Sequence, residues 1–228
     1  MAKSLPRVSL PLLKAEDVIP HLGKPTHWKQ GRSAKAIADS WFRANGLPPA
    51  VRNVIDQSPE LQGAELIDAW LERATDLQDG RATASQTDLL AVLGVNDELV
   101  VLGVEGKVTE SFGPLVSEWL ADGSEGKARR LQSLCEVLDL NPDIVGNLRY
   151  QLFHRTVAAI LEAKRYRSAK AVMLVHSFCP DATGLSDYVA FFNAVGIYNL
   201  RRDQLSEPIT LGHIRFWTGW ASDDCPED

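Results

Sequence analysis

Two short β-rich runs on either side of a turn constrain the fold of this chain more than any other feature. Residues 86–95 read QTDLLAVLGV and residues 99–108 read LVVLGVEGKV, with Asn96-Asp97 between them. Short segments rich in Val and Leu favour strands, and Asn and Asp favour a tight turn. The sequence therefore predicts an antiparallel hairpin in this region.

The segments around the hairpin predict an α/β fold. Residues 171–178 (AVMLVHSF) are almost continuously apolar, as in a central strand that is buried on both faces. Residues 143–166 carry apolar side chains at helical spacing and predict a largely buried helix before that strand. Residues 64–74 fit either a helix or a strand, and we favour a strand because strands follow. The expected order is helix, strand, hairpin, helices, strand.

The whole chain is predicted to form one domain. Four prolines among residues 1–30 predict an irregular N-terminal segment. Residues 31–180 form the expected core, and residues 181–228 form an extension with one helix and one strand. Capping residues and helical spacing predict helices over 33–44, 115–121, 126–138 and 185–195, a weaker helix or a turn over 50–57, and a terminal strand over 213–221.

Composition narrows the class of protein. The chain has 228 residues, of which 45% are hydrophobic and 24% charged, as in a globular protein that buries a sizeable core. No apolar run approaches the ~20 residues of a membrane span, and the start lacks an apolar stretch of signal-peptide length. We therefore expect a cytoplasmic protein with no membrane partner. The three cysteines lie far apart without a CxxC pair, which argues against a disulfide framework and a zinc ribbon.

Charge is unevenly distributed along the chain. The net charge of −6 disfavours binding to phosphate groups, which requires Lys and Arg. Residues 127–170 are an exception, because they carry nine basic and four acidic side chains. This basic segment is either a solvated helix surface or a patch that faces phosphates, and the sequence leaves both alternatives open.

One group of residues predicts a metal site that could act on phosphoryl groups. Asp88 lies in the first strand of the hairpin, and Glu105-Gly106-Lys107 follows in the second. Strand alternation places Glu105 and Lys107 on one face, and a hairpin can bring Asp88 beside them. Two carboxylates suit Mg²⁺ or Mn²⁺, which would polarise a phosphoryl oxygen and acidify a bound water. Lys107 would orient that water or offset the developing negative charge.

At these residues the sequence resembles the PD-(D/E)XK nuclease superfamily. That resemblance implies a restriction-endonuclease-like αβββαβ core, with an acid on the second strand and an (E/D)-x-K triplet on the third. Asp88, Glu105 and Lys107 match those positions, although Thr87 stands where the motif has proline. The phrases HWKQGRSAKAIADSW, SQTDL, VEGKVTESFG and RYQLFHRT also resemble a bacterial domain-of-unknown-function family, over most of residues 25–180.

The resemblance implies site residues and a function. Asp88 and Glu105 would be the metal ligands, and both would be catalytic together with Lys107. The helix after the triplet often supplies a further polar residue, so Arg149, Gln151 and Arg155 are expected to bind substrate. Gln86 shares a strand face with Asp88 and is expected to bind substrate as well. A structural hydrogen bond is the alternative for Gln86, and a structural ion pair with an acidic residue is the alternative for Arg155. The implied activity is Mg²⁺- or Mn²⁺-dependent hydrolysis of phosphodiester bonds in nucleic acid, with DNA favoured over RNA.

Alternatives remain at several positions. Glu105 and Lys107 could form an ordinary ion pair on a strand face. Glu72 and Glu110 could extend the carboxylate cluster, although a solvated or salt-bridged role is favoured for each. We expect His154 to be a core histidine.

The tryptophans and the overall function are also open. Trp41, Trp70 and Trp119 are expected in the core, whereas Trp217 and Trp220 could either pack there or stack on bases. The rival functions are a catalytically inactive nuclease-fold module that binds nucleic acid or a protein partner, and an assembly protein. Homodimer formation is a further open alternative.

Overall fold

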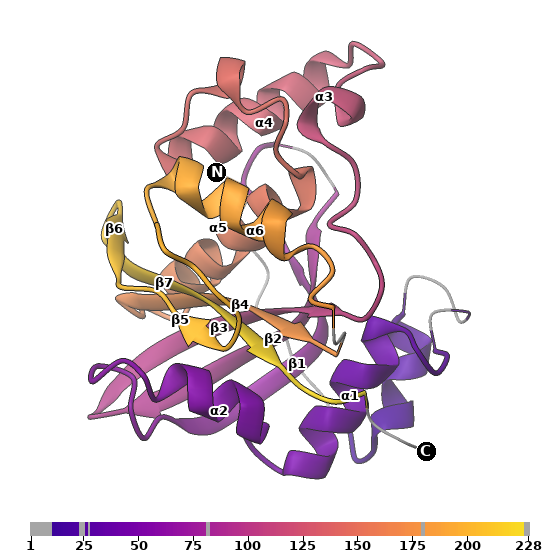
Figure 1. Ribbon diagram of the computed structural model, residues 1–228, viewed down its shortest axis with the longest axis vertical. Helices are drawn as coiled ribbons and strands as arrows, with labels where there is room; N and C mark the ends of the chain where they lie inside the picture. The colour runs from indigo at the N-terminus through magenta and orange to yellow at the C-terminus, as the bar shows by residue number, and fades with distance from the viewer. Residues whose placement is uncertain (1–10, 23–25, 27, 81–82, 179–180, 226–228) are drawn as a thin grey trace.

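The chain folds around a seven-stranded mixed sheet with helices on both faces (Figure 1). The computed structural model describes residues 11–22, 26, 28–80, 83–178 and 181–225. The helices are α1 (Ser33–Ala44), α2 (Pro49–Ile55), α3 (Val116–Trp119), α4 (Glu125–Leu138), α5 (Tyr150–Arg165) and α6 (Leu185–Val195), with 3₁₀ helices η1 (Ala15–His21) and η3 (Pro142–Ile144). The strands are β1 (Glu65–Thr75), β2 (Ser85–Val95), β3 (Glu98–Lys107), β4 (Lys170–Ser177), β5 (Gln204–Leu205), β6 (Ile209–Leu211) and β7 (Ile214–Ser222).

The sheet combines an antiparallel meander with parallel strands. Its order is β1-β2-β3-β4-β7-β5, and β6 also pairs with β7. Strands β1, β2 and β3 are antiparallel, whereas β4 runs parallel to both β3 and β7. Asn96 and Asp97 have φ values of 48° and 61°, the left-handed conformation that a tight two-residue hairpin turn uses. The predicted hairpin and the strand assignment for 64–74 are confirmed.

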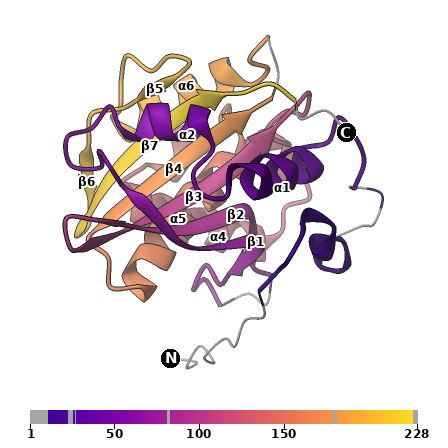
Figure 2. The same ribbon diagram turned by 90° about the horizontal axis from the view of Figure 1, so that it is seen from below.

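Each face of the sheet packs against its own group of helices (Figure 2). On one face, α1 and α2 bury Ile37 and Val51 against strand residues such as Leu102. On the other face, a larger apolar core forms from α4, α5 and α6 and includes Phe153 and Phe191. Strand β4 is buried along almost all of its length, as its continuous apolar sequence predicts.

The helix expected over residues 143–166 is shorter than its apolar pattern indicates. It begins only at Tyr150. The backbone of the preceding residues instead pairs with the segment before and within α3: the Val116 amide donates to the Leu148 carbonyl, and the Tyr150 amide donates to the Pro114 carbonyl. Because those groups are used in tertiary pairing, they are not available for helical hydrogen bonds. The helical prediction is therefore wrong for residues 143–149 apart from the single turn of η3.

Other features of the described residues bear on the tryptophans, the N-terminal segment and the cysteines. Trp217 and Trp220 are fully buried, so a base-stacking role for them is wrong. Helix η1 forms inside the N-terminal segment that was expected to be irregular, while residues 1–10, 23–25 and 27 lie outside the description. Cys135 and Cys225 are free, and Cys179 is not among the described residues. No helix in the described ranges has the length and apolar character needed to cross a bilayer.

Candidate active site

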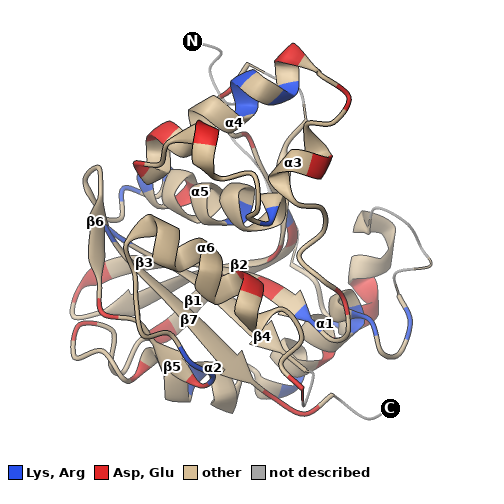
Figure 3. Ribbon diagram, turned by 45° about the horizontal axis from the view of Figure 1, so that its top comes forward, with Lys and Arg blue, Asp and Glu red and all other residues tan. Residues whose placement is uncertain are grey.

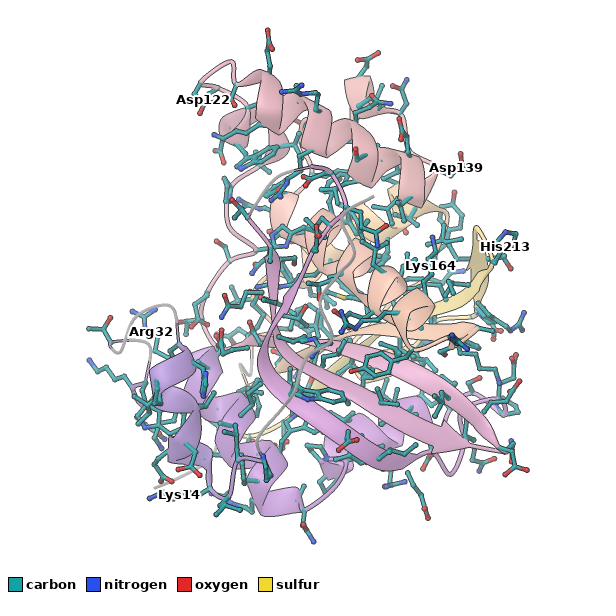
Figure 4. The ribbon with its side chains drawn as sticks, turned by 180° about the vertical axis from the view of Figure 1, so that it is seen from behind. Lys14, Arg32, Asp122, Asp139, Lys164 and His213 are labelled. Carbon is teal, nitrogen blue, oxygen red and sulfur yellow. The ribbon has the colours of Figure 1, made fainter. Side chains whose placement is uncertain are left out.

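A cleft of about 740 Å³ opens at the ends of β2 and β3. Strands β1 to β3 line one side, and α3, α4 and α5 line the other. Arg32 marks the α1 side of the cleft in Figure 4, and Asp122, the ion-pair partner of cleft-lining Lys127, marks the side of α3 and α4. The lining includes acidic, basic and aromatic side chains: Glu72, Asp88, Glu105, Glu110, Lys107, Lys127, Arg130, Arg155, Trp119, Tyr150 and His154.

Strand pairing explains how the predicted triad converges. The β2–β3 ladder pairs Leu89 with Val104, so Asp88 and Glu105 are the next residues outward on neighbouring strands. Alternation directs Glu105 and Lys107 towards α5, whereas the space above Gly106 is bounded by Ile37 of α1. The structure thus brings Asp88, Glu105 and Lys107 to one cleft, as the sequence predicts.

Glu105 is the centre of a closed hydrogen-bond network. Its Oε1 accepts from Lys107 Nζ at 2.7 Å and from Gln151 Nε2 at 2.7 Å, while its Oε2 accepts from Arg155 Nε at 2.5 Å. Lys107 Nζ also donates to Gln151 Oε1 at 3.1 Å. Burial alone would raise the pKa of Glu105, but the charges of Arg155 and Lys107 outweigh it and hold that pKa at about 2. Glu105 is therefore ionised at neutral pH.

Asp88 titrates very differently from Glu105. Its Oδ2 accepts the Gly106 backbone N–H at 2.8 Å, and its Oδ1 lies 3.6 Å from Arg155 Nη2. Burial, followed by the negative charge of Glu105, raises the pKa of Asp88 to about 7, because Arg155 and Lys107 offset these effects only in part. Two neighbouring carboxyl groups with pKa values pushed apart are a common feature of catalytic sites.

Of the remaining candidate residues, some line the cleft and one does not. Gln86 lines the cleft and donates to Glu72 Oε2 at 2.8 Å, and burial raises the pKa of Glu72. Glu110 also lines the cleft, and it accepts the backbone amides of Val108 and Ser33, which sequence reasoning did not predict. Its Oε1 also lies 4.0 Å from Arg32 Nη1, which fits the expected salt bridge. Arg149 is not among the lining residues, since it donates to Asp187 Oδ2 at 2.9 Å on α6.

Sequence reasoning missed an aromatic wall of this cleft. Trp119 stacks on Tyr150 with ring centroids 3.7 Å apart, and the Tyr150 ring lies 5.0 Å from that of His154. Tyr150 and His154 are four residues apart on α5, so their proximity was readable from helical spacing. Trp119 joins them through the tertiary bridge between Leu115 and Arg149, which no local pattern predicts.

His154 also connects two elements of the cleft wall. Its Nδ1 lies 2.9 Å from Ser85 Oγ, and burial followed by the positive charge of Arg155 holds its pKa well below the usual value. The neutral imidazole therefore joins β2 to α5 beside the acidic residues.

Comparison with protein-family models identifies the family of this chain. A domain of unknown function, DUF6946, matches residues 11–225. The chain belongs to the DUF6946 family. Searches of curated proteins and of solved structures find no match.

The donor set of the DUF6946 cleft fits a magnesium-like ion held by few protein ligands. No group of three or more His, Cys, Asp or Glu within the described ranges is placed to hold a metal. Mg²⁺, however, is commonly held by one or two carboxylates together with water and substrate phosphate. Asp88 Oδ1 has no hydrogen bond within 3.5 Å among the described contacts, and Glu105 Oε2 accepts only one. These two oxygens have the capacity to bind a hard cation.

The local charge is consistent with that fit. Three carboxylates, on Glu72, Asp88 and Glu105, face two cations, on Lys107 and Arg155. When all five are ionised the cluster carries one net negative charge. A divalent cation would reverse that sign and create a site for a phosphodiester anion.

Proposed function

We propose that this protein is a metal-dependent phosphodiesterase of the PD-(D/E)XK type that acts on nucleic acid. The observation that carries the proposal is the convergence of Asp88, Glu105 and Lys107 in one accessible cleft. An E-x-K triplet is common in proteins, but its meeting with an aspartate from the preceding strand is much more specific. The raised pKa of Asp88 beside Glu105, whose pKa is lowered to about 2, adds support.

The topology supports a restriction-endonuclease-like core. Helix α1 is followed by the meander β1-β2-β3, by α5, and by β4 parallel to β3. This is the αβββαβ order that the resemblance implies, with the acid on the second strand and the triplet on the third. One continuous sheet and one family match over residues 11–225 also support treating the chain as a single domain.

The predicted residues that line the cleft then have chemical roles. Asp88 and Glu105 would hold Mg²⁺ or Mn²⁺, which when bound polarises a phosphoryl oxygen and acidifies a water. Lys107 supplies a positive charge for the attacking water or for the developing negative charge. Gln151 positions both partners, because it accepts from Lys107 and donates to Glu105. Gln86, on the open side of the cleft, is the proposed substrate contact.

A second candidate is a nuclease-fold module that binds without turnover. The specific observation in its favour is that Glu105 already accepts three hydrogen bonds from Lys107, Gln151 and Arg155. Blue and red segments are interspersed over the ribbon, including α4 and α5 (Figure 3). Five of the nine basic residues in the 127–170 segment form ion pairs with acids, namely Lys127, Arg130, Arg149, Arg155 and Lys170. That pairing reduces the charge available for phosphates.

Cleavage of labelled DNA and RNA in Mg²⁺, Mn²⁺ or EDTA separates the two functions. The wild type would be compared with Asp88→Ala and Lys107→Ala, and Lys170→Ala is the matched control because Lys170 pairs with Glu98 outside the cleft. We expect metal-dependent cutting by the wild type and the control, and none by the two cleft variants. Folded wild type that cuts nothing would reject the enzyme and leave the binding module.

A further inference from the structure

Arg155 lies between the two carboxylates of the candidate metal site. Its Nε donates to Glu105 Oε2 at 2.5 Å, and its Nη2 lies 3.6 Å from Asp88 Oδ1. Its third nitrogen, Nη1, donates to Ser85 Oγ at 3.3 Å. The whole residue is only 8% exposed, so this cation is built into the floor of the cleft.

The Arg155 guanidinium contacts the same carboxylate oxygens that a divalent ion would need as ligands. Glu105 Oε1 is filled by Lys107 and Gln151, and Asp88 Oδ2 accepts the Gly106 amide. The oxygens that remain, Glu105 Oε2 and Asp88 Oδ1, are the two nearest to Arg155. A guanidinium and a divalent cation in the same small space repel each other strongly, because neither is well screened in a buried site.

We propose that Arg155 is an internal counter-ion that competes with the divalent cation for Asp88 and Glu105. This inference rests on the proposed function. In the resting protein Arg155 and Lys107 together neutralise the two acids. When they bind the cation, the guanidinium leaves them and remains held at Ser85. Its freed N–H groups then bind a phosphate oxygen of the substrate, for which their planar geometry is suited.

The hydrogen bond from Arg155 to Ser85 confines the proposed exchange of Arg155 for the cation to the movement of one side chain. Ser85 Oγ bonds to Arg155 and also contacts His154 Nδ1, so one end of the guanidinium has a partner that is not an acid. Ser85 is on β2 and both other residues are on α5, and all three line the cleft. Movement of one side chain therefore changes the site from self-neutralised to cation-binding without moving an element of the fold.

Direct Mn²⁺ binding to the metal-free protein tests the competition without requiring activity. Mn²⁺ would be titrated into wild type, Arg155→Gln and Arg155→Lys, and the free ion measured by its electron paramagnetic resonance signal. We expect Arg155→Gln to bind Mn²⁺ about tenfold more tightly than wild type, since a competing charge is gone. Arg155→Lys keeps a charge without the planar fork and should lie between them, which provides a second variant if the Gln protein fails to fold.

Matched controls separate this effect from a general loss of charge. Arg73→Gln removes another buried arginine that pairs with a glutamate, Glu162, but outside the cleft. It should leave Mn²⁺ affinity unchanged. In Arg155→Ala, guanidinium chloride below denaturing concentrations should weaken Mn²⁺ binding more than KCl of equal ionic strength does. The wild type should not show this difference.

The outcomes distinguish the inference from the proposed function. If wild type binds Mn²⁺ through Asp88, as judged by its loss in Asp88→Asn, but Arg155→Gln binds equally or more weakly, the competition is rejected and the enzyme proposal stands. If no folded variant binds Mn²⁺, both are rejected. Tighter binding by Arg155→Gln than by wild type, with Arg73→Gln unchanged, supports the counter-ion.

Discussion

Glu72 lies opposite Asp88 in the register of β1 and β2, and its backbone is left-handed with φ of 51°. The ladder pairs Leu71 with Leu89 and Arg73 with Thr87, so Glu72 and Asp88 are opposed between these pairs. A left-handed conformation in a strand is unfavourable for a side chain with a Cβ. Such strain is concentrated at functional sites, and here it adjoins the proposed ligand Asp88.

The strain at Glu72 predicts a difference between two substitutions. Glu72→Ala removes the carboxylate but keeps the left-handed Cβ, whereas Glu72→Gly removes both. We expect the Gly variant to be about 0.5–1 kcal/mol more stable than the Ala variant, the reverse of the usual order in a strand. Urea denaturation measures this difference. At Ala69, which has no positive φ, Gly should instead lower stability, and equal values for the two Glu72 variants would argue against backbone strain.

The two proposed metal ligands should have opposite effects on stability, beginning with Asp88. Its pKa is about 7 in the folded protein but near 3.8 in an unfolded chain. Between these values the folded state binds more protons, so the free energy of unfolding falls as pH rises. Asp88→Asn removes this loss, and we expect its stability advantage over wild type to grow by about 2 kcal/mol between about pH 5 and pH 7.

Urea denaturation in EDTA, at several pH values, checks the Asp88 prediction. Asp187→Asn removes a carboxylate that pairs with Arg149 outside the cleft, and it controls for the general effect of losing a charge. If the curves of wild type and Asp88→Asn stay parallel across the whole range, Asp88 does not carry the raised pKa.

Glu105 should behave in the opposite way. Its pKa is lowered to about 2, so its contribution to stability is fully present above about pH 4.5 and is lost as pH falls towards 2. Glu105→Gln leaves Lys107 and Arg155 buried without their shared anion. We expect a loss of about 3–5 kcal/mol at neutral pH by urea denaturation. A loss below 1 kcal/mol would mean that solvent reaches the two cations.

Local patterns predicted β1, β2, β3, β4 and β7 and the residues of the triad, but neither the short strands β5 and β6 nor the position of Arg155 beside the triad. The Asn96-Asp97 turn fixes the register of β2 and β3, and alternation then places Glu105 and Lys107 together. No local pattern shows that Arg155, on a helix distant in sequence, would reach the same carboxylates. Likewise, Arg149 and Arg155 look equivalent in the sequence, but α6 supplies Asp187 for Arg149, whereas Arg155 is turned towards the strand ends.

Local sequence patterns also fail to predict which aromatic side chains are buried and where some helices begin. Periodicity continues through residues 143–149, yet pairing with the α3 segment delays the start of α5 to Tyr150. Trp119 and Trp217 look alike as isolated tryptophans. One lines the cleft because of that same pairing, and the other, on β7, is buried in the core between the sheet and α2. These distinctions depend on tertiary contacts, which no window of the sequence contains.

Gly106 links the position of Asp88 to the packing of α1. A Cβ at residue 106 would lie 2.6 Å from Ile37 Cγ1, 3.1 Å from Ser33 Cβ and 3.3 Å from Asp88 Oδ2. Ile37 is fully buried, so it cannot move aside freely. We expect Gly106→Ala to lower the free energy of unfolding by about 1–3 kcal/mol.

Gly94 in the same hairpin provides the matched control for Gly106. Its added Cβ would meet Ile67 Cδ1 at 3.1 Å, but Ile67 is 54% exposed and can turn away. We therefore expect Gly94→Ala to change stability by less than about 1 kcal/mol and to leave Mn²⁺ binding intact. Gly106→Ala should weaken Mn²⁺ binding, because it displaces Asp88 Oδ2 as well as α1. Unchanged binding in a destabilised Gly106→Ala protein would separate the packing role of Gly106 from the site and would count against Asp88 as a ligand.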